Sequence, residues 1–215
     1  MKLGIFDSGI GGEIIAKALK KTFPNAEIIT VNDHKNIPYG DKTKEEITKL
    51  TDKAIQPLLI KKCDIIIIAC NTATAIAIDY LRSKYDSQKF IGIEPMIKDA
   101  SSLTKTKTIA VCATKATLNS DRYKKLKYKF GNGIEIIEPD CSGWAQMIEN
   151  NKINDSQIIN TINKMTSNNA DVIVLGCTHY HWIKKLIIKT CKDKAIILEP
   201  SKAIGRRVKE LLKSS

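Results

Sequence analysis

The sequence contains one strand pattern twice, and this repeat constrains the fold more than any other feature. Four short apolar segments in the first half of the chain have counterparts in the second half, in the same order and 105 to 108 positions later. The pairs are Leu3–Asp7 with Thr108–Cys112, Ala26–Ile29 with Ile134–Ile137, Ile65–Cys70 with Val172–Cys177, and Ile91–Pro95 with Ile196–Pro200. A period of about 100 residues is a typical domain size, so the repeat predicts two equivalent halves.

Short β-branched runs alternate with longer helical patterns along the whole chain. The expected strands are Lys2–Phe6, Glu27–Val31, Ile65–Ala69, Phe90–Ile93, Lys107–Cys112, Ile134–Ile137, Val172–Leu175 and Ala195–Leu198. The expected helices are Glu13–Lys21, Lys44–Lys61, Thr74–Lys84, Asn119–Phe130, Ser142–Asn150, Ser156–Ser167, His181–Lys189 and Ser201–Leu212. This alternation favours parallel sheets covered by helices.

Two Glu-Pro steps mark the expected crossings between the halves. Proline restricts the residue before it and cannot donate to a strand ladder, which suits a hinge at Glu94–Pro95 and at Glu199–Pro200. We therefore expect one lobe from residues 1–95 plus 199–215 and a second from residues 96–198. The predicted architecture is α/β, with two pseudo-symmetric parallel-sheet lobes and the active site in the cleft between them.

The formal charge of +12 does not indicate a nucleic-acid partner. Of the 35 basic residues, 31 are lysines, and they are scattered along the 215-residue chain. Nucleic-acid readers favour arginine and cluster their charge. The excess of lysine, isoleucine and asparagine is typical of a codon bias instead, so we expect most lysines on solvated helix faces.

Composition and hydropathy predict a cytoplasmic protein without a membrane span. The chain is 43% hydrophobic and 27% charged, which excludes a disordered or low-complexity class. Its longest uncharged stretch, Ile65–Ile78, is shorter than the ~20 apolar residues that a span needs. The N-terminus lacks the pattern of a secretory signal. In the cytoplasm the six cysteines are expected to be thiols.

Two cysteines occupy matching positions after equivalent strands. Cys70 follows the third strand of the first half, and Cys177 follows its counterpart in the second. Ligands bind at the carboxyl ends of such strands, and the start of a helix there is expected to lower the thiol pKa from ~8.5. Two opposed thiols can invert a stereocentre without a cofactor, because one removes a proton while the other delivers one. The other four cysteines, Cys63, Cys112, Cys141 and Cys191, are expected to be buried and inert.

Six motifs, in order along the chain, resemble those of the glutamate racemase family, which belongs to the cofactor-independent aspartate/glutamate racemases. They are Gly4–Gly12 (GIFDSGIGG), Ile37–Gly40 (IPYG), Ala69–Thr74 (ACNTAT), Gly92–Pro95 (GIEP), Ala113–Thr117 (ATKAT) and Gly176–Tyr180 (GCTHY). The resemblance implies interconversion of L- and D-glutamate without pyridoxal phosphate, metal or other cofactor, supplying D-glutamate for peptidoglycan. It implies a small dicarboxylic amino acid as partner, with no nucleic acid and no membrane; a homodimer stays open.

The same resemblance implies roles for individual residues. Cys70 and Cys177 match the catalytic acid/base thiols, with Cys70 deprotonating D-glutamate and Cys177 deprotonating L-glutamate. Asp7, His179 and Glu149 match polar residues that assist the thiols. The positions that hold the substrate's carboxylates and amino group are Ser8, Pro38, Tyr39, Gly40, Asn71, Thr72, Thr114, Thr117 and Thr178. Most of these are neutral donors, which suits a small dicarboxylate.

Several alternatives stay open at this point. Asp7 could merely cap the following helix; a dinucleotide loop fails because Ile14 stands where Gly or Ala is required. Cys177, His179 and His181, with His34, superficially resemble a metal site, although a helix starting there would splay them. The chain is also a few dozen residues shorter than usual, and His181 replaces the family's proline. An aspartate or broad-specificity racemase, a basic nucleic-acid-binding module and an inactive regulator are the rival functions.

Overall fold

A computed structural model describes residues 1–213, which form two compact units. The first contains Met1–Glu94 and the C-terminal segment from Pro200, and the second contains Pro95–Glu199. The chain therefore passes from one unit to the other at its two Glu-Pro steps. No helix within the described residues is both long enough and apolar enough to cross a membrane.

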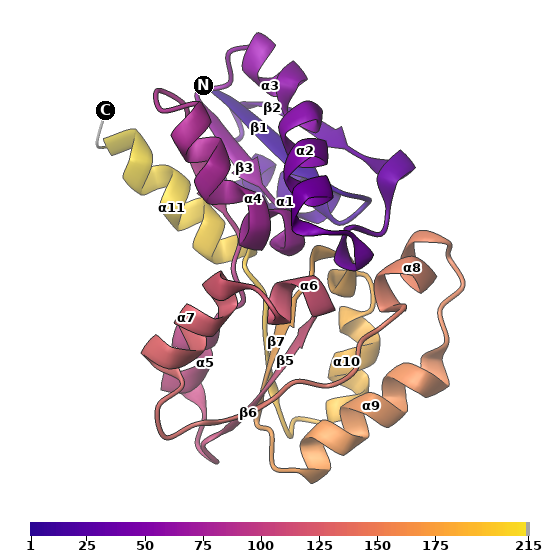
Figure 1. The fold of residues 1–215 in the computed structure, drawn as a ribbon. Helices are drawn as coiled ribbons and strands as arrows, with labels where there is room; N and C mark the ends of the chain where they lie inside the picture. Colours follow the sequence, from indigo (N-terminus) through magenta and orange to yellow (C-terminus); the bar gives the residue numbers. More distant parts are fainter. Residues whose placement is uncertain (214–215) are drawn as a thin grey trace. The chain divides into compact units, whose positions relative to one another are not determined.

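The first unit is built on a four-stranded parallel sheet in the order β2-β1-β3-β4 (Figure 1). Its strands are β1 (Lys2–Asp7), β2 (Glu27–Asn32), β3 (Ile65–Ile68) and β4 (Lys89–Gly92). Its helices are α1 (Gly12–Thr22), α2 (Lys44–Ala54), α3 (Gln56–Ile60), α4 (Asn71–Lys84) and α11 (Ser201–Lys213), with 3-10 turns η1 (His34–Asn36) and η2 (Tyr39–Asp41). In the register of the central strands, Phe6 lies beside Ile68, so Asp7 and Cys70 follow neighbouring strand ends.

The second unit repeats this plan with the strand order β6-β5-β7-β8. Its strands are β5 (Thr108–Ala113), β6 (Glu135–Ile137), β7 (Val172–Gly176) and β8 (Ile196–Leu198). Its helices are α5 (Ile97–Leu103), α6 (Lys115–Leu118), α7 (Asp121–Phe130), α8 (Trp144–Glu149), α9 (Asp155–Ser167) and α10 (Lys184–Cys191), with the 3-10 turn η3 (Thr178–His181). Each strand of the first sheet thus has its predicted counterpart at the same place in the second, which confirms the repeat.

Alternating side chains of the central strands fill the core on both faces of the first sheet. All four residues of β3 are buried. Ile65 and Ile67 belong to a cluster with Ile204 and Val208 of α11, and α1 packs against α11 on that face. Successive strand residues point to opposite faces, so Ile66 and Ile68 face the other side, where α2 and α4 pack together. Burial on both faces explains the unbroken isoleucine run.

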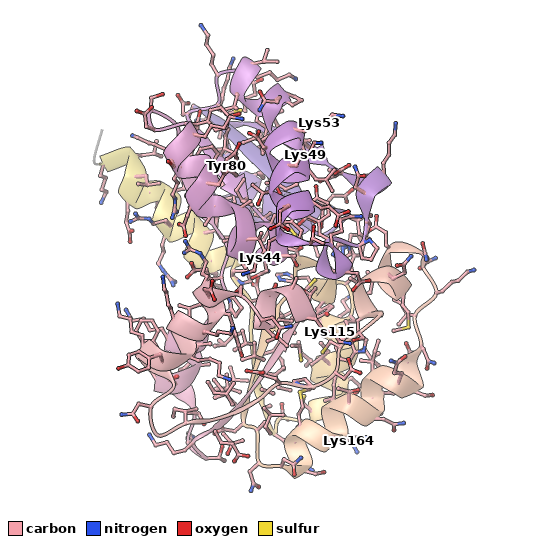
Figure 2. All side chains as sticks on the ribbon, in the orientation of Figure 1. Lys44, Lys49, Lys53, Tyr80, Lys115 and Lys164 are labelled. Atoms are coloured by element: carbon pink, nitrogen blue, oxygen red, sulfur yellow. The ribbon has the colours of Figure 1, made fainter. Side chains whose placement is uncertain are left out.

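The lysines lie mainly on solvated helix surfaces, as the composition suggested. Lys49 and Lys53 on α2, Lys115 on α6 and Lys164 on α9 are all exposed (Figure 2). The positive charge is therefore distributed over the exposed faces of several helices.

Three predicted helices differ most from the structure, each for an identifiable reason. The predicted helix over residues 44–61 divides at Ile55, because Pro57 in the first turn of α3 cannot donate a backbone hydrogen bond. The helix predicted from Thr74 begins at Asn71, since the Cys70 side chain caps it. The helix predicted from His181 begins at Lys184, after a 3-10 turn. The short helices α5 and α6 were not predicted, because neither is long enough to show a helical period.

Candidate active site

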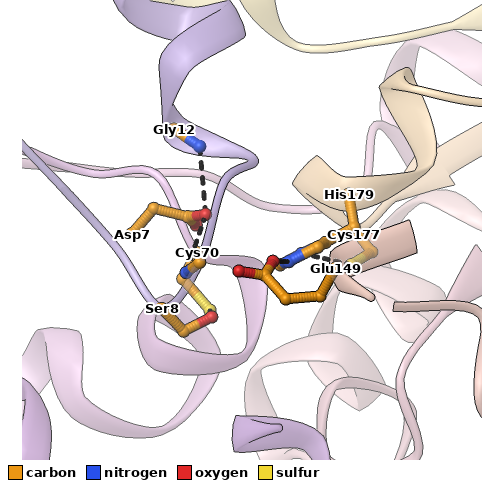
Figure 3. A network of polar contacts seen from close by, with 8 residues as sticks. Asp7, Ser8, Gly12, Cys70, Glu149, Cys177 and His179 are labelled. Carbon is orange, nitrogen blue, oxygen red and sulfur yellow. Dashed lines mark hydrogen bonds and ion pairs between the residues drawn. The ribbon is translucent and has the colours of Figure 1, made fainter. Parts of the chain in front are cut away.

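Cys70 caps helix α4 at the carboxyl end of β3. Its thiol is 5% exposed and accepts hydrogen bonds from the Ser8 hydroxyl at 3.3 Å and from the Ala73 amide at 3.5 Å (Figure 3). The start of α4 is fixed independently, because the Thr74 hydroxyl donates to the Ile68 carbonyl at 3.0 Å and accepts from the Ile93 amide at 3.1 Å. The sulfur therefore has a defined position on a rigid element and donors suited to a thiolate.

Asp7 lies at the end of the neighbouring strand and is completely buried. Its Oδ2 accepts from the Gly12 amide at 3.0 Å and from the Gly9 amide at 3.3 Å, so the carboxylate does cap α1 (Figure 3). Only glycine fits at position 12, since a Cβ there would lie 2.7 Å from the Asp7 Cβ. Asp7 therefore caps α1, and its charge also acts on the Cys70 thiol.

The expectation that the helix start lowers the pKa of Cys70 was wrong. Burial and, to a smaller extent, the nearby Asp7 charge raise the pKa of this thiol, which is about 11 in total. Hydrogen bonds from Ser8 and from the Ala73 and Thr72 amides lower the pKa, but they do not outweigh burial. In the free protein Cys70 is therefore a thiol at neutral pH.

We expect the rate of Cys70 alkylation by iodoacetamide to rise about tenfold per pH unit from about pH 7 to pH 10, because only the thiolate reacts. It should level off near the pKa of about 11. Mass spectrometry of the Cys70 peptide measures this rate separately from the other thiols. Asp7→Asn should move the curve to lower pH, since a charge that raises the pKa is lost. A flat profile would contradict the expectation, because it would mean that the thiol is already ionised at neutral pH.

At the equivalent strand end of the second unit, the polar neighbour of the thiol is a histidine. Cys177 follows β7 and is 7% exposed, with its Sγ 3.9 Å from Nδ1 of His179. Nε2 of His179 lies 2.7 Å from Oε2 of Glu149, which comes from the end of α8 (Figure 3). The imidazole thus links a buried thiol to a carboxylate, and the carboxylate fixes its orientation.

The 3-10 turn after Cys177 places the ring of Tyr180 against that of Trp144, next to the contact between His179 and Glu149. Tyr180 packs edge to face on Trp144 of α8 at 5.3 Å and donates to the Cys141 carbonyl at 3.4 Å. These contacts join η3 to α8 and therefore hold His179 against Glu149. The segment after Cys177 is a 3-10 turn, and the α-helix of this segment begins only at Lys184. No group of metal-ligating side chains within residues 1–213 has the arrangement of a metal site.

All six cysteines are buried free thiols, as expected. Cys63 and Cys191 lie away from the two strand ends that carry Cys70 and Cys177. Cys141 lies beside Cys112, and their hydrogen bond together with burial raises the pKa of the Cys141 thiol well above its usual range. All four of these thiols are enclosed like other core residues.

The neutral residues expected to hold substrate lie at the same strand ends. In the first unit Ser8, Tyr39, Asn71 and Thr72 are buried, and Pro38 and Gly40 flank Tyr39. In the second unit Thr114 caps α6, and its hydroxyl lies 3.0 Å from that of buried Thr117. Thr114 follows β5 where Ala113 pairs with Gly176, next to Cys177 and Thr178.

Asn71 is the most informative of these residues. It is 3% exposed, yet neither Oδ1 nor Nδ2 of its amide has a hydrogen-bond partner within the described chain. A buried polar group without a partner is costly, so such a group indicates a ligand position. Beside Cys70, the amide nitrogen can donate and the amide oxygen can accept, which suits the carboxylate and ammonium groups of an amino acid.

The sequence interpretation missed Asp33 and Asn36, which support Tyr39. Asp33 directly follows β2, and its Oδ2 accepts from the Tyr39 hydroxyl at 2.8 Å. The signal was present, since β2 is the neighbour of β1 and a carboxylate at its end lies at the same sheet edge.

The fold and these two thiols define a class of enzyme. The sequence profile described as Asp/Glu/Hydantoin racemase matches residues 13–203. The chain belongs to this family and is therefore a racemase, an isomerase by reaction class.

Within the family the chain is similar to glutamate racemases over nearly its whole length. It is 38% identical to that of Clostridium botulinum over 97% of this chain and 84% of the relative, and 40% identical to that of Fusobacterium nucleatum over 99% and 81%. The solved structure of the Francisella tularensis glutamate racemase in complex with D-glutamate matches with a TM-score of 0.82 and 32% identity, over 99% of this chain and 81% of that one. The Escherichia coli glutamate racemase has the same fold, with a TM-score of 0.90 at 23% identity over 99% and 82%.

Proposed function

We propose that the protein interconverts L- and D-glutamate through Cys70 and Cys177, which act as the two acid/base groups. The observation that supports this most directly is the pair of buried thiols at equivalent strand ends of two repeated sheets, each with its own polar partner. Relatives named glutamate racemase, at 38% and 40% identity, support glutamate as the substrate. The product D-glutamate would serve peptidoglycan synthesis.

In the proposed reaction one thiolate removes the α-proton and the other thiol returns a proton to the opposite face. Starting from D-glutamate, the Cys70 thiol first gives its own proton to Asp7. The Cys70 thiolate then accepts the α-proton, the substrate becomes an α-carbanion, and Cys177 gives its proton to the opposite face. Starting from L-glutamate, the roles reverse. No electrons leave the system, so the reaction needs no redox partner.

The carbanion is the difficult intermediate, and hydrogen bonding to the substrate must stabilise it. Charge that develops at the α-carbon spreads into the carboxylate, where preorganised donors are most effective. Asn71, Thr72, Thr117 and Thr178 offer neutral donors at the strand ends, and their burial excludes water. Asp7 would assist Cys70, while His179, held by Glu149, would exchange protons with Cys177.

The test is an assay of the purified protein with both dicarboxylic amino acids. Without added cofactor or metal, we expect solutions of L-glutamate and of D-glutamate to reach the same final optical rotation, that of the racemic mixture. We also expect deuterium from the solvent to be incorporated at the α-carbon. Aspartate should react at least about tenfold more slowly in kcat/KM, the effect expected for a site shaped for one more methylene. Equal or faster turnover of aspartate would replace the substrate assignment, and no turnover of either would reject the proposed function.

A further inference from the structure

A hydrogen-bonded loop next to the Cys70 site is organised around one carboxylate. Asp33 Oδ2 accepts from the Tyr39 hydroxyl at 2.8 Å, and the Asn36 amide donates to both carboxylate oxygens at 2.9 and 3.0 Å. The Asp33 amide in turn donates to the Asp7 carbonyl at 3.1 Å. A single residue thus joins the turns η1 and η2 to the strand that carries Asp7.

Tyr39 is held in the core of the first unit by this bond and by packing. It is 2% exposed, and its ring contacts that of Phe6 at 6.2 Å between centroids. The turn η2 packs against α4, the helix that Cys70 caps. Burial and the Asp33 contact raise the pKa of the Tyr39 phenol far above its usual range, and the Cys70 and Asp7 groups add to this shift. The phenol therefore keeps its proton and stays close to both groups.

The chemistry of the phenol limits what Tyr39 can do. A tyrosine hydroxyl can donate one hydrogen bond, and Tyr39 donates it to Asp33. The hydroxyl therefore cannot also donate to a substrate carboxylate. What the segment can still offer are the backbone N–H groups of Tyr39 and Gly40, whose positions depend on where the phenol is anchored.

We propose that Asp33 is a positioning residue for substrate binding, which acts through Tyr39 by anchoring the 37–40 segment beside Cys70. This inference rests on the proposed function, because it concerns the binding of the racemised amino acid. It assigns to Asp33 a role in ground-state binding and none in proton transfer, since its carboxylate is occupied by Tyr39 and Asn36.

The test compares steady-state constants of Asp33→Ala, Asp33→Asn and the control Asp41→Ala, which removes an exposed carboxylate from the same loop. Asp33→Ala should raise KM for glutamate about tenfold, within the range for a hydrogen bond to a charged group, and change kcat by less than about threefold. Asp33→Asn keeps an acceptor for Tyr39 and should lie between wild type and Asp33→Ala. Asp41→Ala should match wild type.

Two further measurements make the test decisive. In a Tyr39→Phe background, Asp33→Ala should raise KM no further, because its effect passes through the phenol. Without substrate, ultraviolet titration should show one tyrosine ionising at lower pH in Asp33→Ala than in wild type. Wild-type KM in both Asp33 variants, a loss confined to kcat, or multiplicative effects with Tyr39→Phe would each overturn the proposal. An inactive wild-type protein would reject the proposed function, while an unchanged tyrosine titration would independently reject the Asp33–Tyr39 link.

Discussion

Replacing either Cys70 or Cys177 with serine is expected to lower kcat/KM for glutamate racemisation by about 10² to 10⁴-fold, the usual contribution of a positioned acid or base. A serine hydroxyl is nearly the same size as a thiol but is a much weaker acid, so it neither removes the α-proton nor donates one in the required time. Circular dichroism of glutamate measures racemisation directly. The isosteric change separates the loss of acidity from a loss of packing.

The two serine variants should differ from each other in proton exchange. In Cys177→Ser the remaining Cys70 can still remove the α-proton of D-glutamate and return a deuteron to the same face. We therefore expect exchange of D-glutamate in heavy water to persist above racemisation, while exchange of L-glutamate is lost. Cys70→Ser should give the opposite result. Proton NMR of each enantiomer distinguishes these outcomes.

Matched controls come from buried cysteines of the same units. Cys63→Ala in the first unit and Cys191→Ala in the second remove thiols of similar burial and should leave racemisation per folded molecule unchanged. Full racemisation by either serine variant, or equal loss in the alanine controls, would contradict the two-thiol mechanism.

The second large effect is expected at Glu149. Glu149→Gln keeps the shape of the side chain but removes the charge that faces His179 Nε2 at 2.7 Å. The neutral amide supports an imidazolium poorly, so kcat/KM should fall about 10- to 100-fold, the effect of losing an outer hydrogen-bond partner. Glu135→Gln, which changes an exposed carboxylate in the same unit, should have no effect.

The equilibrium between the two enantiomers limits how the kinetic constants of Glu149→Gln can change. L- and D-glutamate have equal free energies, so any variant must lose the same factor in kcat/KM in both directions. The asymmetry of the assisting groups should instead appear in exchange: Glu149→Gln should slow L-glutamate exchange, which depends on Cys177, more than D-glutamate exchange. Equal slowing of both exchange reactions would contradict a specific role beside Cys177.

The periodic features of this fold could be predicted from the sequence. Strand runs such as Ile65–Ile68 are apolar on both faces, and the repeated offset determined their equivalence in the two sheets. Helix boundaries that depend on a single interaction were harder to predict from the sequence. The thiol cap that starts α4 at Asn71 and the break at Ile55 depend on one side chain and one proline.

The sequence motifs indicate candidate site residues, but the electrostatics of those residues could not be predicted from them. Motif position identified Cys70, but the direction of its pKa shift depends on the balance between burial, Asp7 and the amides of α4. That balance is a property of packing in three dimensions. The place of Asp33 after β2 could have been read from the sequence, but its hydrogen bond to Tyr39 could not, because that bond crosses a turn whose geometry no periodicity reveals.

The order of synthesis differs from the order in which the units become complete. Helix α11 belongs to the first unit, where Ile204 and Val208 join the cluster formed by α1 and the first sheet. A ribosome therefore releases every strand and helix of the second unit before it supplies the helix that closes the core of the first. The unit whose strands are synthesised first is therefore the last to complete its hydrophobic core. One face of its sheet stays partly exposed until α11 has been synthesised.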